Sequence, residues 1–301
     1  MNYYTNLSTI ILHVSGRDSR RYLNARLSND IKIISPGQGC YAAALSPQGK
    51  TEGYFNISCI SNEEFLVTCD GGDRETVVKA FKRYLVADRV VVKDLSDESR
   101  LTSLFPTPEG HALLSLLKVE ALPGRICNHI KIGEAFLIKS KRAKTDSFDF
   151  IVPLDFHESI ISALKNAGAK ELSGNEFALL RIKSSTPSFP KELNEDVIFS
   201  ASGLDYAVSF KKGCYVGQEV IEKIDAYGRV PYVLKALVVD GDASGQYEIK
   251  LENAAFSNDK VLSCYYDNTE NKTYFFVELK NRDNILDSHF LINDNQAHIL
   301  C

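Results

Sequence analysis

The 301-residue sequence predicts an α+β fold that ends in an all-β unit. Three observations predict it. Residues 40–95 show the patterns of strand, strand, strand, helix and strand, in that order. Residues 101–183 contain a second mixture of strands and amphipathic helices, which indicates another α+β layer. After Gly228 only strand patterns remain, and these favour a small β-barrel or sandwich.

The first half of the chain begins with a segment at 9–14 that predicts a strand. Asp18 is expected to cap the helix that follows, in which Tyr22, Leu23 and Leu27 form one apolar face. Arginines occupy the other faces of that helix, and we expect a solvated surface there, with a basic rim for an anionic ligand as the alternative. They are Arg17, Arg20, Arg21 and Arg26. Further strands are predicted at 38–45, 53–60, 64–68 and 89–93, with a helix after Gly72.

In the second half, strands are predicted at 101–104, 136–139 and 148–152, and helices at 110–119, 156–167 and 175–183. A short strand or extended segment is predicted at 206–210. A further helix follows Gly217, because Val220, Ile221 and Ile224 fall at helical spacing. The strands of the C-terminal unit are expected at 234–240, 246–251, 260–266, 273–279 and 297–300.

Composition is that of a soluble globular protein, with 44% hydrophobic and 25% charged residues. The net charge of −4 argues against a general binder of nucleic acids or membrane surfaces. No segment approaches the ~20 apolar residues of a membrane span. The first ten residues lack the pattern of a secretory or mitochondrial signal, so we expect a cytoplasmic protein. Seven cysteines without CxxC spacing indicate a reducing compartment, and they form no metal-ligand cluster with the six histidines.

The most informative segment is Lys212-Gly213-Cys214-Tyr215-Val216-Gly217-Gln218-Glu219. It places one thiol between two glycines, beside lysines and ahead of a helix. A helix N-terminus and nearby lysines both favour the thiolate form of a cysteine. Gly213 and Gly217 are expected to need a positive φ or a close backbone approach. The segment therefore predicts a reactive Cys214, and a half-buried structural cysteine is the competing interpretation.

All eight positions fit the KGC[FY]xGQE motif, and on them the chain resembles the YgfZ family. Members of that family bind folate, help to assemble or maintain iron–sulfur clusters, and are related to the glycine-cleavage aminomethyltransferases. Other segments are similar to the family's GxDxxxFLxxxLTND opening, LSPQGK turn, LRIxxGxP approach and LGLD lead-in. They lie at residues 16–30, 44–50, 180–187 and 203–205. The resemblance covers most of residues 10–235.

The chain departs from the family pattern at four places. Ser28 replaces a threonine, residues 185–186 replace a glycine-containing step, and residues 199–202 lack the expected proline and glutamate. Lys223 replaces an arginine, which keeps the charge but loses the planar fork. These changes leave Cys214 intact and affect the details of the folate pocket.

The resemblance implies a three-domain ring of the aminomethyltransferase type, with two interleaved α+β domains and a C-terminal β-barrel. Residues 1–45 and 145–228 would form the first domain, which carries the cysteine motif. Residues 46–144 would form the second and residues 229–301 the barrel. The resemblance also implies tetrahydrofolate or a derivative as cofactor. Its implied partners are iron–sulfur assembly proteins or client enzymes, including those of tRNA modification, with no direct nucleic-acid contact.

A bound folate needs a carboxylate for its pterin edge, apolar walls for its rings and basic groups for its glutamate tail. Asp149 lies where the related transferases carry a glutamate for the pterin, and an exposed strand residue is the alternative. Asp30 is a second candidate, although closing its own turn explains it equally well. Lys223 or Arg229 could meet the tail and Tyr227 could stack on a ring, against the alternatives of exposed charges and a packing tyrosine.

Three functions follow from these observations. The first is a folate-binding accessory protein for iron–sulfur proteins, with Cys214 as the functional thiol. Because a cluster usually takes four protein ligands, Cys214 would act with a partner, with a second copy, or as a redox or transfer thiol. The second is an aminomethyltransferase, but the acidic pair of those enzymes is replaced here by Gly53-Tyr54, with Glu52 nearby. The third is a folate-binding scaffold without chemistry.

Overall fold

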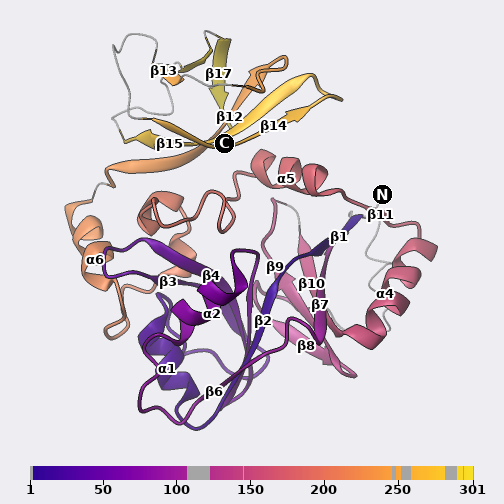
Figure 1. Ribbon diagram of the computed structural model, residues 1–301, viewed down its shortest axis with the longest axis vertical. Coiled ribbons are helices and arrows are strands. Elements are labelled where there is room, and N and C mark those ends of the chain that lie inside the picture. The colour runs from indigo at the N-terminus through magenta and orange to yellow at the C-terminus, as the bar shows by residue number, and fades with distance from the viewer. Residues whose placement is uncertain are drawn as a thin grey trace.

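The computed structural model describes residues 3–106, 123–144, 146–228, 230–245, 249–251, 259–281, 290–293 and 295–300. The predicted helix at 110–119 lies outside these residues. Three sheets organise the described chain (Figure 1). Two of them form a body built from residues 3–171, and the third, from the C-terminal part, lies above that body in the view of Figure 1. The mixed α+β class is confirmed.

The first body sheet has the strand order β3-β4-β5-β2-β6. The helices α1 (Ser19–Arg26) and α2 (Arg74–Lys82) belong to the same core, through residues such as Leu23 and Phe81. Asp73 caps α2 by accepting a hydrogen bond from the Thr76 N–H. The strands are β2 (Ile10–Ser15), β3 (Gly39–Leu45), β4 (Thr51–Ser61), β5 (Glu64–Cys69) and β6 (Val91–Asp94).

The second body sheet has the order β11-β1-β7-β10-β9-β8. Phe148, Phe150 and Val152 alternate along β10 and pack with Ile161 and Leu164 of α4 (Leu154–Asn166). The opposite face carries Ile151, which joins Ile11 and Leu66 of the first sheet in a shared apolar cluster. The strands are β1 (Tyr3–Leu7), β7 (Ser99–Phe105), β8 (His129–Ile132), β9 (Ala135–Ser140), β10 (Ser147–Pro153) and β11 (Lys170–Glu171).

The C-terminal sheet has the order β13-β16-β17-β12-β15-β14, so β13 and β14 are its edges among the described residues. The predicted closure into a barrel stays a prediction. The sheet packs on α5 (Gly174–Lys183) through Tyr274, Phe276 and Ile182. Its strands are β12 (Tyr232–Asp240), β13 (Ile249–Leu251), β14 (Lys260–Asp267), β15 (Lys272–Lys280), β16 (Phe290–Ile292) and β17 (Asn295–Ile299).

The division into domains at 1–45 with 145–228, 46–144 and 229–301 also stays a prediction. The pairing of β3 with β4 places the 45/46 boundary inside one sheet. The third sheet contains only residues from Tyr232 onward, in agreement with a separate C-terminal unit. In the described part of the chain, no helix has the length and apolar character needed to cross a bilayer.

Three local predictions were wrong, the first two because a tertiary partner outweighs the local pattern. Asp18 does not cap α1, since its carboxylate accepts a hydrogen bond from the Arg89 N–H at 2.9 Å. Arg26 is only 1% exposed and pairs with Glu52 at 2.6 Å instead of lying on a solvated face. The interpretation of 206–210 as a strand is wrong, because a short 3₁₀ helix, Asp205–Ala207, occupies its start, while Val208 after it is extended.

His129 makes the stability of this fold sensitive to acid. It is buried at the start of β8, and burial lowers the pKa of its imidazole below the ordinary 6.5. As the pH falls below about 6.5, the unfolded chain takes up a proton that the folded chain does not. The free energy of unfolding should therefore fall as the pH is lowered from 7 to 5, through this group. In urea titrations across that range His129→Leu should flatten the decline, whereas the same change at the exposed His298 should not.

Candidate functional site

The cysteine motif forms a loop that ends at the start of α6 (Gln218–Tyr227). Cys214 is exposed in this loop. Gly217 begins the helix in the left-handed conformation, with φ of 83°. A Cβ atom at Gly217 would lie 2.5 Å from the carbonyl oxygen of Ser46, so the backbone approach at this position is one that only glycine permits. The expected need for a positive φ or a close backbone approach is confirmed for Gly217. It is wrong for Gly213, which has open space around it and no positive φ.

The contact of Gly217 with Ser46 brings two sequence motifs together. The 46–50 turn, closed by hydrogen bonds between Ser46 and Lys50, packs directly on the first turn of α6. A Cβ at Gly49, whose φ is 73°, would lie 3.0 Å from the side chain of Val220. Segments more than 160 positions apart in the sequence numbering therefore form one rigid support for the thiol loop.

Lys212 anchors the other end of the loop. Its Nζ donates hydrogen bonds to the carbonyl oxygens of Asn24, Leu27 (2.6 Å) and Asn29 (2.9 Å) at the end of α1. Burial lowers the pKa of Lys212 to about 8. Its ammonium lies over the ring of Tyr215, at 4.9 Å from the ring centroid. The charge predicted to act on Cys214 is thus committed to backbone carbonyls, and Lys211 remains as the exposed neighbour.

The remaining motif residues divide into supporting and exposed ones. Tyr215 is buried, and the Gln218 side chain accepts a hydrogen bond from its backbone N–H at 3.0 Å. The Gln218 amide also donates to Glu222 on the next turn of α6. Glu219 is exposed in the first turn of that helix. The loop is therefore held from both sides while its thiol faces solvent.

Removing the Lys212 ammonium should loosen this loop. Lys212→Met keeps the length of the side chain but leaves three carbonyls without their donor, so we expect a loss of about 1–3 kcal/mol in the free energy of unfolding. Lys211→Met, on the exposed neighbour, is the matched control and should change stability by no more than about 0.5 kcal/mol. Urea unfolding of both variants measures the difference, and equal stabilities would show that Lys212 has no anchoring role.

A cavity of about 250 Å³ lies in the body, beneath α5 and next to the loop at 186–191. Tyr41 and Tyr54 stack in its wall with ring centroids 5.4 Å apart, and Tyr206 meets Tyr41 edge-on at 5.8 Å. The hydroxyls of Tyr54 and Tyr206 are hydrogen-bonded at 3.2 Å. Burial raises the pKa of all three phenols, so each stays a neutral donor. Phe177 of α5 and Lys141 also line the space.

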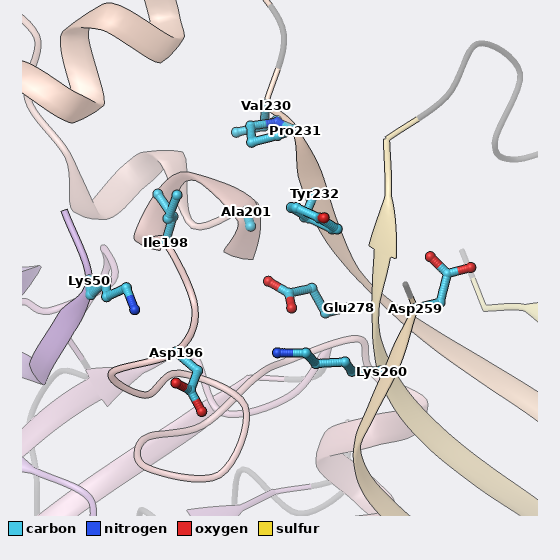
Figure 2. Close-up of a pocket in the computed structure, with 10 residues that line it drawn as sticks. All are labelled: Lys50, Asp196, Ile198, Ala201, Val230, Pro231, Tyr232, Asp259, Lys260 and Glu278. Carbon is cyan, nitrogen blue, oxygen red and sulfur yellow. The ribbon is translucent and has the colours of Figure 1, made fainter. Parts of the chain in front are cut away.

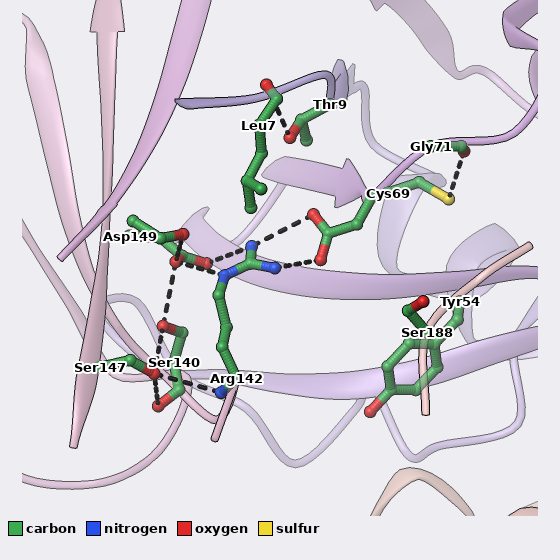
Figure 3. Close-up of polar contacts among 12 residues, drawn as sticks. Leu7, Thr9, Tyr54, Cys69, Gly71, Ser140, Arg142, Ser147, Asp149 and Ser188 are labelled. Atoms are coloured by element: carbon green, nitrogen blue, oxygen red, sulfur yellow. Dashed lines mark hydrogen bonds and ion pairs between the residues drawn. The ribbon is translucent and has the colours of Figure 1, made fainter. Parts of the chain in front are cut away.

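Arg142 is the charged centre of this cavity wall (Figure 3). Its guanidinium contacts both oxygens of Asp149, Oδ1 at 2.6 Å and Oδ2 at 2.7 Å, and forms a second, two-pronged pair with Asp70. Burial opposes the charged form, but the two carboxylates outweigh it and hold the pKa of Arg142 well above its ordinary value. Hydroxyls of Ser103 and Ser140 donate to Asp149 at 2.7 and 3.0 Å.

Asp149 and Asp70 take different positions in this network. Asp149 is 1% exposed and does not line the cavity, so the interpretation of it as an exposed strand residue is wrong. The Asp70 side chain is 38% exposed and does line the cavity, together with Arg142. A ligand in the cavity therefore meets Arg142 and Asp70, and Asp149 acts on it through Arg142.

The other predicted folate residues do not gather at this cavity. Asp30 accepts a hydrogen bond from the Lys32 N–H at 2.9 Å, which closes its own turn. Lys223 and Tyr227 lie exposed on α6, and neither lines the cavity. Arg229 lies outside the described residues. The roles assigned to these residues stay predictions.

Asn29 links the cavity to the cysteine motif. Its side-chain amide donates to the backbone carbonyls of Tyr41 (2.8 Å) and Tyr206 (3.0 Å), and its own carbonyl accepts from Lys212. The two sites therefore share one hydrogen-bonded residue, although Cys214 itself does not line the cavity.

Sequence reasoning missed Arg142, Asp70 and the tyrosine cluster. Asp70 directly follows a strand and precedes two glycines, and side chains in such positions often reach a cavity. This position was a signal in the sequence that could have identified Asp70. Arg142 carried no local signal, since its partners are Asp70, directly after β5, and Asp149 of β10. No group of three or more potential metal ligands occurs in the described part of the chain.

Glu52, the carboxylate nearest to the expected transferase position, is directed away from the cavity. It forms ion pairs with Arg26 and Arg83, each at 2.6 Å. Tyr54, two residues later, faces the cavity instead.

Comparison with known proteins shows the family to which this chain belongs. The model of the GCVT N-terminal domain matches residues 8–212, more than half of the chain. An aminomethyltransferase of Thermoanaerobacter pseudethanolicus is 22% identical over 95% of this chain and 78% of its own length. A putative chloroplastic transferase of Arabidopsis thaliana is 24% identical over 72% of this chain, which spans about half (51%) of that relative's length.

The fold itself has a solved counterpart. The crystal structure of the glycine cleavage system aminomethyltransferase T from Bartonella henselae superposes with a TM-score of 0.84, at 13% sequence identity. The similarity covers 98% of this chain and 84% of that one. The match of the family model over residues 8–212 shows that the chain belongs to the family defined by the GCVT N-terminal domain.

Proposed function

We propose that this protein is a folate-binding accessory factor of the YgfZ type, which supports the assembly or repair of iron–sulfur proteins with Cys214 as its functional thiol. The observation that carries the proposal is an exposed thiol on a loop that is fixed at both ends, by Lys212 and by Gly217. A structural cysteine would be buried, as Cys59, Cys69 and Cys127 are. The eight-residue motif supports the YgfZ type.

The folate would bind in the cavity lined by Tyr41, Tyr54 and Tyr206. Its volume of about 250 Å³ suits a pterin ring, but is smaller than the ~300–1,000 Å³ of most ligand sites, so the tail would extend outside. The pterin would lie against the stacked tyrosines with its polar edge at Arg142 and Asp70. Lys141 and Lys191, both exposed at the cavity, are the lysines that could meet the glutamate tail.

The aminomethyltransferase function has less support from the site. That reaction needs a carboxylate near the reacting folate nitrogen. In this cavity Asp70 is paired with Arg142, and Glu52 is held by two arginines away from it. Folate-dependent release of ammonia from an aminomethyl donor would favour the enzyme over the accessory factor.

Cells that lack the protein provide the test of the proposed function. Complementation with Cys214→Ala should fail to restore the activities of iron–sulfur enzymes, although the variant should fold and bind folate as the wild type does. The readout is the activity of several cluster enzymes and of a matched enzyme without a cluster.

The control is Cys40→Ala, because Cys40 is half-buried on β3 and burial raises the pKa of its thiol to about 12. This variant should complement fully. Full complementation by Cys214→Ala would remove the thiol from the mechanism and leave a folate-binding scaffold. None of the six described cysteines is in a disulfide, in keeping with a reducing compartment such as the cytoplasm.

A further inference from the structure

A second cavity lies between the body and the C-terminal sheet, apart from the one that Arg142 faces. Its volume is about 460 Å³, within the range of small-molecule sites. One wall comes from the body, with Lys50 of the 46–50 turn and Asp196 and Ile198 of the loop before the 3₁₀ helix Phe199–Ser202. The facing wall comes from the C-terminal sheet, with Tyr232 of β12, Lys260 of β14 and Glu278 of β15. Ala201, Val230 and Pro231 complete an apolar side.

Glu278 is the unusual residue of this cavity. Along β15, Tyr274 and Phe276 face α5 and the body. Because every second side chain of a strand points to the same face, Glu278 lies on this face too. It is only 7% exposed. Figure 2 shows its carboxylate directed into the space between the two walls, where Lys260 and Lys50 also reach. A buried position in an otherwise apolar row thus carries a charge that faces the cavity.

Among the described residues, no hydrogen bond or ion pair reaches the Glu278 carboxylate. Burial raises the pKa of Glu278, and Lys260 and Lys50 counteract this only in part, with Asp196 adding to the increase. A buried carboxylate without a direct partner is costly, and natural structures retain such groups where something else satisfies them. A bound ligand is one such partner.

The arrangement of charges indicates what that ligand carries. Two lysines and three carboxylates line the cavity: Lys50 and Asp196 on the body, and Lys260, Asp259 and Glu278 on the sheet. Asp259 accepts a hydrogen bond from the Lys280 N–H at 2.8 Å, and Figure 2 shows its carboxylate directed away from the space between the walls. A simple anion would be attracted by the lysines but repelled by the carboxylates, and a simple cation would be attracted by the carboxylates but repelled by the lysines. A molecule with both charges can pair with Lys50, Lys260 and Glu278 at once. The apolar side, including Ile198, Pro231 and Tyr232, leaves room for an uncharged side chain.

We infer that this cavity binds a small zwitterion of amino-acid size, with its ammonium group at Glu278 and its carboxylate between Lys50 and Lys260. The site is separate from the proposed folate cavity and does not depend on it. None of its residues belongs to the cysteine loop at 212–219. Lys50, which lines the cavity, belongs to the 46–50 turn that packs on Gly217. A bound ligand would therefore contact the turn that supports the thiol loop.

Calorimetric titration of the whole protein with the free L-amino acids, each at about 10 mM, tests the inference. At least one should bind, and acetylation of its amine or amidation of its carboxylate should each weaken binding about tenfold or more. Glu278→Gln, which keeps the shape and removes the charge, should have the same effect. Asp240→Asn, an exposed carboxylate at the other end of β12, is the matched control and should bind as the wild type does.

The inference is overturned if no free amino acid binds, if Glu278→Gln binds as tightly as the wild type, or if a diamine or dicarboxylate binds as well as the zwitterion. Glu278→Gln removes an unpaired buried charge, so it should unfold at the same temperature or a higher one. If it does not fold, the exposed Lys260→Met replaces it, with the same expected loss of binding. Folate binding should be unchanged in both variants, which separates failure of this site from failure of the proposed function.

Discussion

Replacing Arg142 by methionine is expected to lower the free energy of unfolding by about 3–5 kcal/mol. Methionine fills much of the same volume, so the loss comes from the charges and not from packing. Asp149 is buried at 1% exposure and would be left with only the hydroxyls of Ser103 and Ser140 as partners. A buried carboxylate without its counter-ion is among the most costly defects in a folded protein. Urea unfolding monitored by circular dichroism gives the value.

A double variant tests whether the unpaired carboxylate of Asp149 causes this loss of stability. In the double variant Arg142→Met, Asp149→Asn the buried charge is absent, and most of the lost stability should return. Arg74→Met is the matched control, because Arg74 also pairs with two aspartates, Asp94 and Asp97, but is 40% exposed. It should cost no more than about 1 kcal/mol. An equal loss in Arg142→Met and Arg74→Met would contradict the account given for Asp149.

The same network decides which aspartate recognises the proposed folate. Asp70→Asn should fold normally, because its side chain is partly exposed, yet it should weaken the binding of tetrahydrofolate about tenfold. Lys191→Met, at the mouth of the cavity, should have a smaller effect, since a single exposed charge contributes little. If Asp70→Asn binds folate normally, the pterin edge does not lie at Asp70.

The sequence predicted most helices and strands because their periodicity is local. The alternation of Phe148, Phe150 and Val152 predicts β10, and the helical spacing of Val220, Ile221 and Ile224 predicts α6. The β1 strand was missed, because its partners are β7, about 100 residues away, and β11 near residue 170. Pairing over such distances leaves no pattern in the segment itself.

The candidate site shows the same limit. The loop of Cys214 was predicted from its glycines, and Gly217 does take the left-handed conformation. The direction in which Lys212 points was not predictable, because its partners are carbonyls at the end of α1, almost 190 positions earlier. Arg142 and Asp149 are close in the sequence, but the third member of their network, Asp70, directly follows β5 of the other body sheet. Buried ion pairs join distant elements, so local patterns do not reveal them.

Gly217→Ala is expected to have the second large effect, a loss of about 2–5 kcal/mol in the free energy of unfolding. About 1–2 kcal/mol of this comes from placing a Cβ on a backbone with φ of 83°. A further ~1–3 kcal/mol comes from overlap, since the new atom would lie 2.5 Å from the Ser46 carbonyl oxygen and 2.9 Å from the Leu45 Cβ. Neither neighbour can easily move, because Leu45 is fully buried in β3 and Ser46 is held by its hydrogen bonds to Lys50.

Gly213→Ala is the matched control, at the other glycine of the same loop. A Cβ there meets no atom within 4 Å, so the substitution should change stability by no more than about 0.5 kcal/mol and leave the alkylation rate of Cys214 unaltered. Gly217→Ala should alter that rate, because the 46–50 turn and α6 can no longer pack as they do. Thermal unfolding and timed alkylation with iodoacetamide measure both effects. Equal behaviour of the two alanine variants would show that the contact between the 46–50 turn and Gly217 does not hold the thiol loop, and only Lys212 would remain as its anchor.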